Sequence, residues 1–363
     1  MIGKESHSKE WLENTRRLLK GKDPILIEKV IKALTLLEQL KLKGLDFIFK
    51  GGSSLLLLLR EINRFSIDID IIIPSESRGL DELFKTIIAE GVFTGYEEDK
   101  RDNATTVPKA HFKFFYNSVL NIGLQNAVVL LDILFEPNPY PQTVSLPVES
   151  PFISTGPPLV KVTLPGVDCI LGDKLTAFAP NTTGIPYGKG KSLEIIKQLY
   201  DIGKLFDHSD NIQIVKKTFE YIAGKELQYR NLSQTDIVQV LDDIFETTVI
   251  IAFRGTYKKD YFAELNEGIK KIIHFTYSEQ YRIEDAVVSA GKAAYLSLLL
   301  KRLFKVSSLE EICRFDKKED LSYLDIIHPD FTKFNKFKKY RPEAFFYWFR
   351  AIDLLGEAGD KLE

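Results

Sequence analysis

The sequence predicts an α+β protein, in which a small α/β sheet lobe is followed by a larger helical bundle. Strand-like alternation of apolar and polar residues is found before residue 137. Helical spacing dominates after residue 165, and eight prolines lie between the two parts. Because 363 residues exceed the usual size of a single domain, we expect two, 1–165 and 166–363.

The elements of the first lobe follow from local signals. Asp23 and Pro24 form the cap and first turn of a helix that ends at Gly44. The segment 66–73 alternates polar and apolar residues until Pro74 closes it, which predicts a strand. The elements expected, in order, are helix 24–44, strand 46–49, helix 53–62 and strands 66–73, 111–116 and 127–136.

The second half of the chain reads differently. Residues 137–165 contain the eight prolines and few charges, so we expect an extended connector there. Apolar residues then recur at helical spacing. The clearest expected helices are 192–206, 234–250, 261–273, 283–304 and 342–355.

Composition and charge exclude several classes of protein. With 44% hydrophobic and 28% charged residues and a net charge of −2, the chain has no global attraction for polyanions, so any such site must be a local patch. Two distant cysteines, Cys169 and Cys313, indicate neither a disulfide framework nor a zinc site. No leader or membrane-spanning stretch is recognisable. We therefore expect a soluble cytoplasmic protein without a membrane partner.

Two aspartates in segment 66–73 raise the question of function. Residues two apart in a strand point the same way, about 6.5 to 7 Å apart, so Asp68 and Asp70 would place like charges side by side. Asp132 adds a third carboxylate within an otherwise apolar strand, where an unpaired charge is costly. Carboxylates converging on one sheet favour a divalent metal with oxygen ligands, and Mg²⁺ fits best.

A glycine turn precedes this strand. Gly51 and Gly52 allow the backbone to approach a ligand closely, and Ser53 is expected to begin a helix whose N-terminus suits phosphate. Each feature alone is common, because a polar strand face and a glycine pair also occur without function. Their order along the chain, together with Asp132, favours a catalytic site.

At this point the residues resemble a known family. G-G-S followed by R-F-S-I-D-I-D is similar to the signature of the DNA polymerase β-type nucleotidyltransferases, and specifically to the AbiEii/AbiGii and MenT-like toxin group. The resemblance is good over 50–73 and patchier to Asp207. It implies a polymerase β-type sheet lobe, and transfer of a nucleoside monophosphate from an NTP to an acceptor hydroxyl with release of pyrophosphate. The acceptor implied is RNA, such as tRNA, and the protein would be the toxin of a toxin–antitoxin or phage-defence system with a cognate antitoxin protein.

The resemblance also implies roles for individual residues. Asp68, Asp70 and Asp132 would hold two Mg²⁺ ions, or Mn²⁺ in their place, with Asp132 binding the ion that activates the acceptor. The nucleotide would be bound by Gly51, Gly52, Ser53, Ser66 and Lys174.

A second cluster in 166–363 would contribute to the same site. Lys174, in GDKLTAF, resembles the family lysine that neutralises triphosphate, and Asp201, in KQLYDIGKLFD, resembles the acid that supports catalysis. Gln198 stands where an aspartate is more usual in the family.

Basic residues interleave with aromatics in KFNKFKKYR, the mixture expected where phosphates and unstacked bases bind. A solvated helix face with core aromatics is the alternative. The candidate RNA-binding residues are Lys333, Lys336, Lys338, Lys339 and Arg341. His111, His208 and His274 show no ligand-like spacing and are interpreted as structural.

A second function remains open, that of a catalytically inactive module of the same fold that binds a nucleotide or an antitoxin. The intact set of three acids favours the enzyme, and nucleotide-dependent labelling of RNA separates the two.

Overall fold

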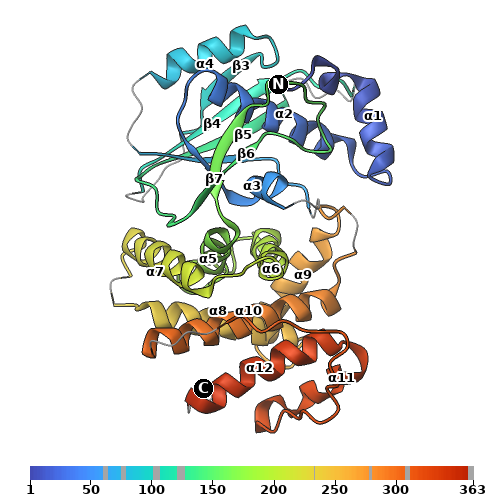
Figure 1. Ribbon diagram of the computed structural model, residues 1–363, viewed down its shortest axis with the longest axis vertical. Coiled ribbons are helices and arrows are strands. Elements are labelled where there is room, and N and C mark those ends of the chain that lie inside the picture. The colour runs from blue at the N-terminus through green and yellow to red at the C-terminus, as the bar shows by residue number, and fades with distance from the viewer. Residues whose placement is uncertain are drawn as a thin grey trace. The chain divides into compact units, whose positions relative to one another are not determined.

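The computed structural model describes residues 1–59, 64–74, 79–100, 107–120, 127–232, 234–277, 280–306 and 311–358 (Figure 1). The chain divides into two compact units. We call them the sheet unit, Met1–Gly166 with His274–Glu279, and the helical unit, Val167–Ile273 with Gln280–Glu363. The predicted α+β class is confirmed.

Within its described residues the sheet unit contains one mixed sheet of seven strands in the order β3-β4-β5-β2-β1-β7-β6. Strand β2 lies at its centre, antiparallel to β1 and parallel to β5, and β5 pairs with β4 in the antiparallel sense. The strands are β1 Ile48–Lys50, β2 Ile69–Ile73, β3 Gly95–Glu98, β4 Lys109–Tyr116, β5 Ala127–Phe135, β6 Thr143–Pro147 and β7 Lys161–Pro165.

One face of this sheet carries the apolar core. Ile71 of β2 and Ile133 of β5 are buried there in one cluster with Leu34 of α2 and Phe84 of α4. Asp23 caps α2 through a 2.9 Å hydrogen bond from Ile25 N, as the sequence predicts. The helices of the unit are η1 Lys4–His7, α1 Lys9–Leu18, α2 Pro24–Leu42, α3 Gly51–Leu58 and α4 Leu80–Ala89.

The strand expected at 66–73 is shorter than predicted, because β2 begins at Ile69. The preceding residues bond elsewhere: Phe65 N donates to Phe275 O at 2.7 Å, and the Ser53 hydroxyl donates to Asp68 O. Asp68 therefore lies just before the strand. Similarly, α3 begins at Gly51, two residues before the expected Ser53, and residues 60–62 of the expected helix lie outside the described residues.

The proline-rich connector is the clearest wrong prediction. It contains two paired strands, β6 and β7, which end in Pro147 and Pro165 and lie at one edge of the sheet. Proline is tolerated at sheet edges and strand ends. The high proline content therefore indicated a connector although strands are present. Helix α4 and strand β3 were not predicted from the sequence.

The helical unit is built around α10, which packs against α6, α8 and α12. All five expected helices are present with ends shifted by at most three residues. No helix in the described parts combines the length and apolar character needed to cross a bilayer. The elements are α5 Val167–Ala177, α6 Ser192–Phe206, α7 Ile212–Tyr229, α8 Ile237–Ala252, α9 Lys259–Ile272, α10 Ile283–Lys305, η2 Pro329–Lys336, α11 Phe337–Tyr340 and α12 Pro342–Ala358.

Candidate active site

Four titratable residues form a row across the centre of the sheet. Asp70 of β2 is the register partner of Lys50 on β1 and of Asp132 on β5. Asp132 is in turn the partner of His111 on β4. Because residues paired in this way project from the same face, these four residues cross four neighbouring strands on the face opposite Ile71 and Ile133. We call this set, Lys50, Asp70, Asp132 and His111, the acid row. Two of the three predicted acids are therefore direct neighbours.

Asp132 has a specific partner in this row. His111 Nδ1 lies 2.7 Å from Asp132 Oδ1, and the exposed fractions of the two side chains are 12% and 33%. His111, interpreted from the sequence as structural, is hydrogen-bonded to a predicted site residue. No local signal reveals the pair, because the two residues are 21 positions apart.

The glycine turn lies against the acids. Gly51 has a φ of +76°, and a Cβ atom there would fall 2.2 Å from Asp70 Oδ2. Only glycine fits, because the backbone is left-handed and the Asp70 carboxylate occupies the space of a side chain. The turn therefore lies against the carboxylate of Asp70, one of the three acids predicted to bind metal.

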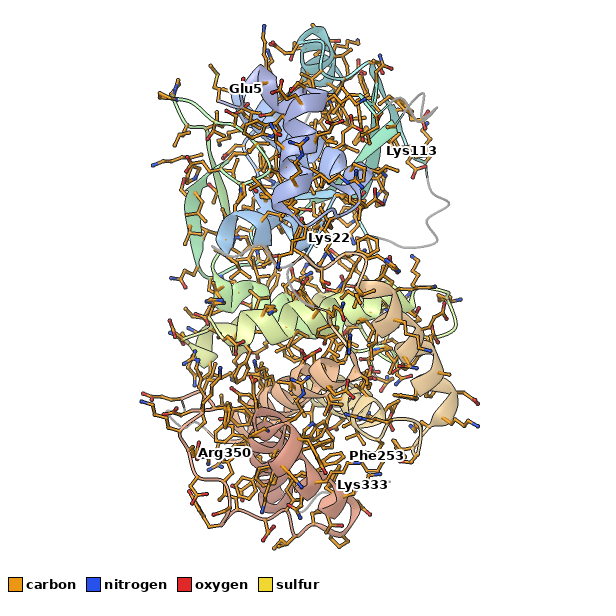
Figure 2. All side chains as sticks on the ribbon, turned by 90° about the vertical axis from the view of Figure 1, so that its right-hand side faces the viewer. Glu5, Lys22, Lys113, Phe253, Lys333 and Arg350 are labelled. Carbon is orange, nitrogen blue, oxygen red and sulfur yellow. The ribbon has the colours of Figure 1, made fainter. Side chains whose placement is uncertain are left out.

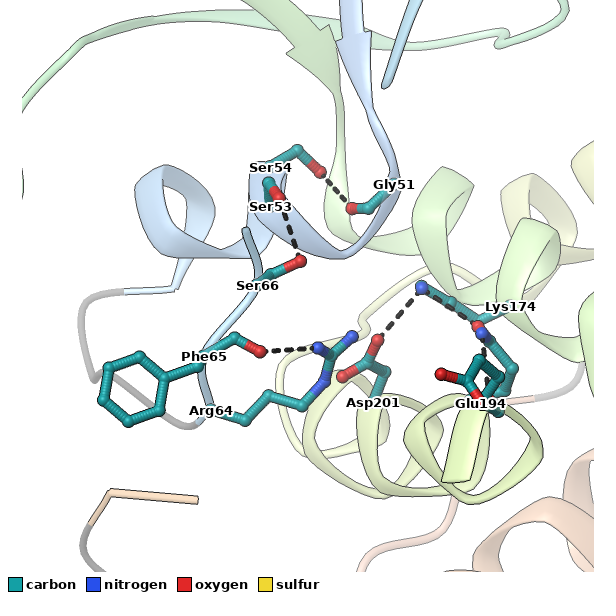
Figure 3. A network of polar contacts seen from close by, with 10 residues as sticks. Gly51, Ser53, Ser54, Arg64, Phe65, Ser66, Lys174, Glu194 and Asp201 are labelled. Atoms are coloured by element: carbon teal, nitrogen blue, oxygen red, sulfur yellow. Dashed lines mark hydrogen bonds and ion pairs between the residues drawn. The ribbon is translucent and has the colours of Figure 1, made fainter. Parts of the chain in front are cut away.

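Gly51 and Gly52 are also the first residues of α3, whose N-terminal backbone N–H groups have no side-chain cap. Ser53 Oγ and Ser66 Oγ are hydrogen-bonded at 2.8 Å, and Ser54 Oγ donates to Gly51 O at 2.8 Å (Figure 3). The contact between Ser53 and Ser66 holds the first turn of α3 against the segment that leads into β2, and the Ser54 contact lies within that turn. Free N–H groups and the positive end of the helix dipole are suited to phosphate.

Arg64 is a residue to which the sequence analysis gave no role, although it begins the R-F-S-I-D-I-D motif. Its side chain is buried, and Nη1 donates to Phe65 O at 3.0 Å (Figure 3). A Cβ at Gly52 would fall 2.5 Å from Arg64 Nη2, so the guanidinium lies against the backbone of the turn. A positive charge here adds to the attraction of this turn for an anion.

The acids fit a magnesium ion as a pair rather than as a complete cage. Within the described residues, no three or more His, Cys, Asp or Glu side chains are grouped to hold a metal ion. Asp68 is exposed and lies outside the strand, while Asp70 and Asp132 are in register. Mg²⁺ is usually bound through one or two carboxylates together with substrate phosphates. Asp70 and Asp132 provide the carboxylates of such a donor set.

The second cluster lies within the helical unit. Lys174 of α5 forms a 2.9 Å ion pair with Asp201 of α6 (Figure 3). Its Nζ also donates to Gln198 Oε1 at 3.0 Å. The structure thus brings together the two residues that the sequence analysis paired. Gln198, at the position of the usual aspartate, accepts a hydrogen bond from the lysine.

Several side chains of the basic segment, Lys333 to Arg341, already have partners within the helical unit. Lys338 pairs with Asp325 at 2.7 Å, and Arg341 pairs with Asp285 at 3.2 Å. The Lys333 ammonium lies 3.2 Å from the centre of the Phe253 ring, and the two side chains are seen together in Figure 2. The aromatics Phe334 and Phe337 are buried, whereas Tyr340 is 72% exposed.

A large open pocket of about 1,110 Å³ lies elsewhere in the sheet unit and contains none of the predicted site residues. Ala110 and Phe112 of β4 line it. They alternate with His111, so this pocket is on the opposite face of the sheet from the acid row. Its size alone does not make it the site.

Comparison with known proteins adds to this geometry. The profile of the family described as "Nucleotidyl transferase AbiEii toxin, Type IV TA system" matches residues 35–267. No curated protein matches the sequence. Among solved structures, JHP933 from Helicobacter pylori is 13% identical, with a TM-score of 0.43 over 82% of this chain and 94% of that one. A proposed nucleotidyltransferase from H. pylori is 12% identical, with a TM-score of 0.40 over 78% and 97%.

The family match covers more than half of the chain. It includes the glycine turn, the acid row and the pair formed by Lys174 and Asp201. This confirms the resemblance drawn from the motifs, and with it the assignment as a nucleotidyltransferase. The chain belongs to the AbiEii family of nucleotidyltransferase toxins of type IV toxin–antitoxin systems.

Proposed function

We propose that this protein is a Mg²⁺-dependent enzyme that transfers a nucleoside monophosphate from an NTP to a hydroxyl group of RNA, with tRNA as the acceptor we favour. One observation carries the proposal. Asp70 and Asp132 are in register on neighbouring parallel strands, and the Asp70 carboxylate packs against the Gly51 turn at the start of α3. Two carboxylates beside a glycine turn at a helix N-terminus support a site for metal ions and a triphosphate.

Asp68, Asp70 and Asp132 would hold the metal ions, with the triphosphate supplying further oxygen ligands. The bound ions would supply neutralisation of phosphate charge and a lower pKa for the acceptor hydroxyl. Gly52 and the first N–H groups of α3 would bind the outer phosphates.

The transfer itself exchanges one phosphorus–oxygen bond for another. The acceptor oxygen forms a bond to the α-phosphorus, and its proton passes to the Asp132 carboxylate. The bond from the α-phosphorus to the bridging oxygen breaks, and pyrophosphate leaves with that electron pair. A positive charge near the leaving group stabilises the charge that develops there, and we assign this role to Lys174, with Asp201 as its partner.

An RNA acceptor requires a local basic surface, because the whole chain carries a net charge of −2. The segment from Lys333 to Arg341 is our candidate for it. Membership of a toxin family also implies an antitoxin partner. We place the protein in the cytoplasm, where RNA and NTPs are available. Two distant cysteines fit this reducing compartment, because they do not form a disulfide framework.

The decisive experiment is incubation of the purified protein with total RNA and each of four α-³²P-labelled NTPs, with and without Mg²⁺. We expect label to enter RNA only with Mg²⁺, and we expect Asp68→Asn and Asp70→Asn to abolish it. Asp46→Asn serves as a matched control, because this acid of the same unit is 94% exposed and pairs with Lys41.

Thermal stability should hold or rise in Asp68→Asn and Asp70→Asn, since each removes a charge from an acidic group. Near-normal transfer by either variant would refute the metal assignment. If the wild-type protein labels nothing yet binds an NTP, the alternative holds, namely an inactive module that binds a nucleotide or an antitoxin.

A further inference from the structure

The acid row places two carboxylates directly opposite each other on neighbouring strands. Asp70 and Asp132 are Cα partners on adjacent strands, which are about 4.8 Å apart. Like charges directly opposite each other are destabilising. Some neighbour must fix the direction of each carboxylate if both are to face one ligand.

His111 is the neighbour that meets this need for Asp132. It lies on β4, on the side of Asp132 away from Asp70, and its Nδ1 is 2.7 Å from Asp132 Oδ1. A carboxylate accepts, so the ring nitrogen donates in this contact. With Oδ1 held from the outer side, Oδ2 has one preferred direction, and the carboxylate cannot rotate freely.

We propose that His111 is a positioning residue for Asp132, which orients this carboxylate for metal binding and for the transfer reaction. The inference rests on the proposed function, and it names a residue that the motifs of the chain do not contain. Carboxylates that bind metals are commonly held by hydrogen bonds from outside the metal shell, and losing such a partner costs about 10- to 100-fold in metal affinity or activity.

A purely structural role for His111 makes a different prediction. In that case any replacement that packs well would serve, whereas a positioning role depends on a donor at the place of Nδ1. Asparagine carries an amide N–H near the position of Nδ1, and glutamine carries one near the position of Nε2. The pair His111→Asn and His111→Gln therefore separates the two roles with similar changes in polarity.

Lys113 offers a matched control on the same strand and the same face. It lies two residues from His111, and its ammonium pairs with Asp99 at 2.9 Å and with Glu97 at 3.4 Å, both outside the acid row. Lys113→Gln removes a polar contact from β4 without touching Asp132.

The test measures Mn²⁺ affinity by electron paramagnetic resonance and, separately, kcat and KM for transfer. His111→Gln should weaken Mn²⁺ binding and lower kcat by about tenfold or more with little change in the KM for NTP. His111→Asn should recover most of both, and Lys113→Gln should match the wild type. In an Asp132→Asn background, His111→Gln should add no further loss of Mn²⁺ affinity.

The inference is overturned if His111→Gln binds Mn²⁺ like the wild type, or if both His111 variants lose affinity equally. It is also overturned if the wild type binds Mn²⁺ with the same affinity as Asp132→Asn. Failure of the proposed function has another signature, in which the wild type transfers no nucleotide to any RNA while Mn²⁺ binding still responds to His111.

Discussion

Lys174 Nζ lies 2.9 Å from Asp201 Oδ2, and the two side chains are only 9% and 1% exposed. Charges that far from solvent stabilise a protein only while they are paired. Gln198 Oε1 accepts a further hydrogen bond from the lysine at 3.0 Å. The lysine that we assign to the leaving group is therefore also part of the structure that joins α5 to α6.

The first prediction separates these two roles of Lys174. Lys174→Met should destabilise the protein by about 3 to 5 kcal/mol, because it removes the ammonium that pairs with the buried Asp201 carboxylate. The double variant Lys174→Met with Asp201→Asn should recover much of that stability. Urea unfolding of the wild type, both single variants and the double variant measures the coupling between the two side chains.

Nucleotide binding then decides the catalytic role. If the ammonium acts on the triphosphate, the refolded double variant should still bind NTP more weakly by about 1.5 to 3 kcal/mol, the range for a charged hydrogen bond. Full recovery of NTP affinity together with stability would mean that Lys174 has a structural role only.

The acid row shows how far the sequence could lead. Alternation in IDIDIII predicted a strand and the side on which Asp70 projects, because period two is a strong local signal. The start of that strand was wrong, since Ser53 and Phe275 bond the residues before Ile69 and neither contact is local in sequence. The pairing of His111 with Asp132 depends on register between strands, which a single sequence does not state.

The helical unit was easier to predict than the sheet edges. Long amphipathic segments such as α6 have matching periodicity and flanking signals over many residues. Strands β6 and β7 are five residues each, and both end in proline, so composition pointed away from them. The segment His274–Glu279 belongs to the sheet unit, with contacts such as the bridge from Thr276 to Arg64. No local sequence pattern predicts this contact between distant residues.

The second prediction concerns the Gly51 turn. Gly51→Ala should destabilise the protein and strongly reduce transfer, because the new methyl group would meet Asp70 Oδ2 at 2.2 Å. Gly188→Ala is the matched control, since Gly188 has a similar φ of +72° with no atom within 4 Å of its would-be Cβ. Both variants bear the cost of a left-handed alanine, about 1 to 2 kcal/mol, so their difference in unfolding free energy reports the clash.

Equal losses of stability and activity in Gly51→Ala and Gly188→Ala would contradict this account. They would mean that the Asp70 carboxylate can move away at no cost, and that its contact with the turn does not position it.

The third prediction concerns pH and the N-terminal part of the sheet unit. Burial, and then the charge of Lys32 at 3.3 Å, lower the pKa of His7 from 6.5 to about 4. A histidine with a lowered pKa binds fewer protons when folded, so stability is present above pH 6.5 and is lost as pH falls towards 4. Because the ring is partly exposed, we expect an effect of about 2 kcal/mol rather than the full shift.

His7→Gln should flatten the dependence of stability on pH between 6.5 and 4. Lys32→Met should flatten it only in part, because burial is the larger cause and remains. Urea unfolding at several pH values, followed by Trp11 fluorescence in a Trp348→Phe background, measures this in the sheet unit. An unchanged slope in His7→Gln would assign the acid sensitivity to other groups.

The last prediction tests the basic segment as an RNA-binding surface. Burial lowers the pKa of Lys333, and the nearby charge of Lys336 lowers it further. Lys338 and Arg341 already have acidic partners, at Asp325 and Asp285. An RNA phosphate would have to compete with these carboxylates, so the contribution of each lysine should be smaller than for a fully available charge.

We therefore expect Lys336, Lys338 and Lys339 changed together to glutamine to weaken RNA binding and to reduce the slope of log affinity against log salt. Removing one lysine–phosphate interaction reduces that slope by a little under one unit, about 0.7 to 0.9, so the slope of the triple variant should be smaller by about one to two and a half. Lys225, Lys270 and Lys271 changed to glutamine give the same charge change elsewhere in the helical unit and should leave the slope nearly unchanged.

NTP affinity should be the same in both triple variants, because neither alters the acid row. If the two variants weaken RNA binding equally, the effect is one of net charge, and the segment from Lys333 to Arg341 is a solvated surface over the buried rings of Phe334 and Phe337.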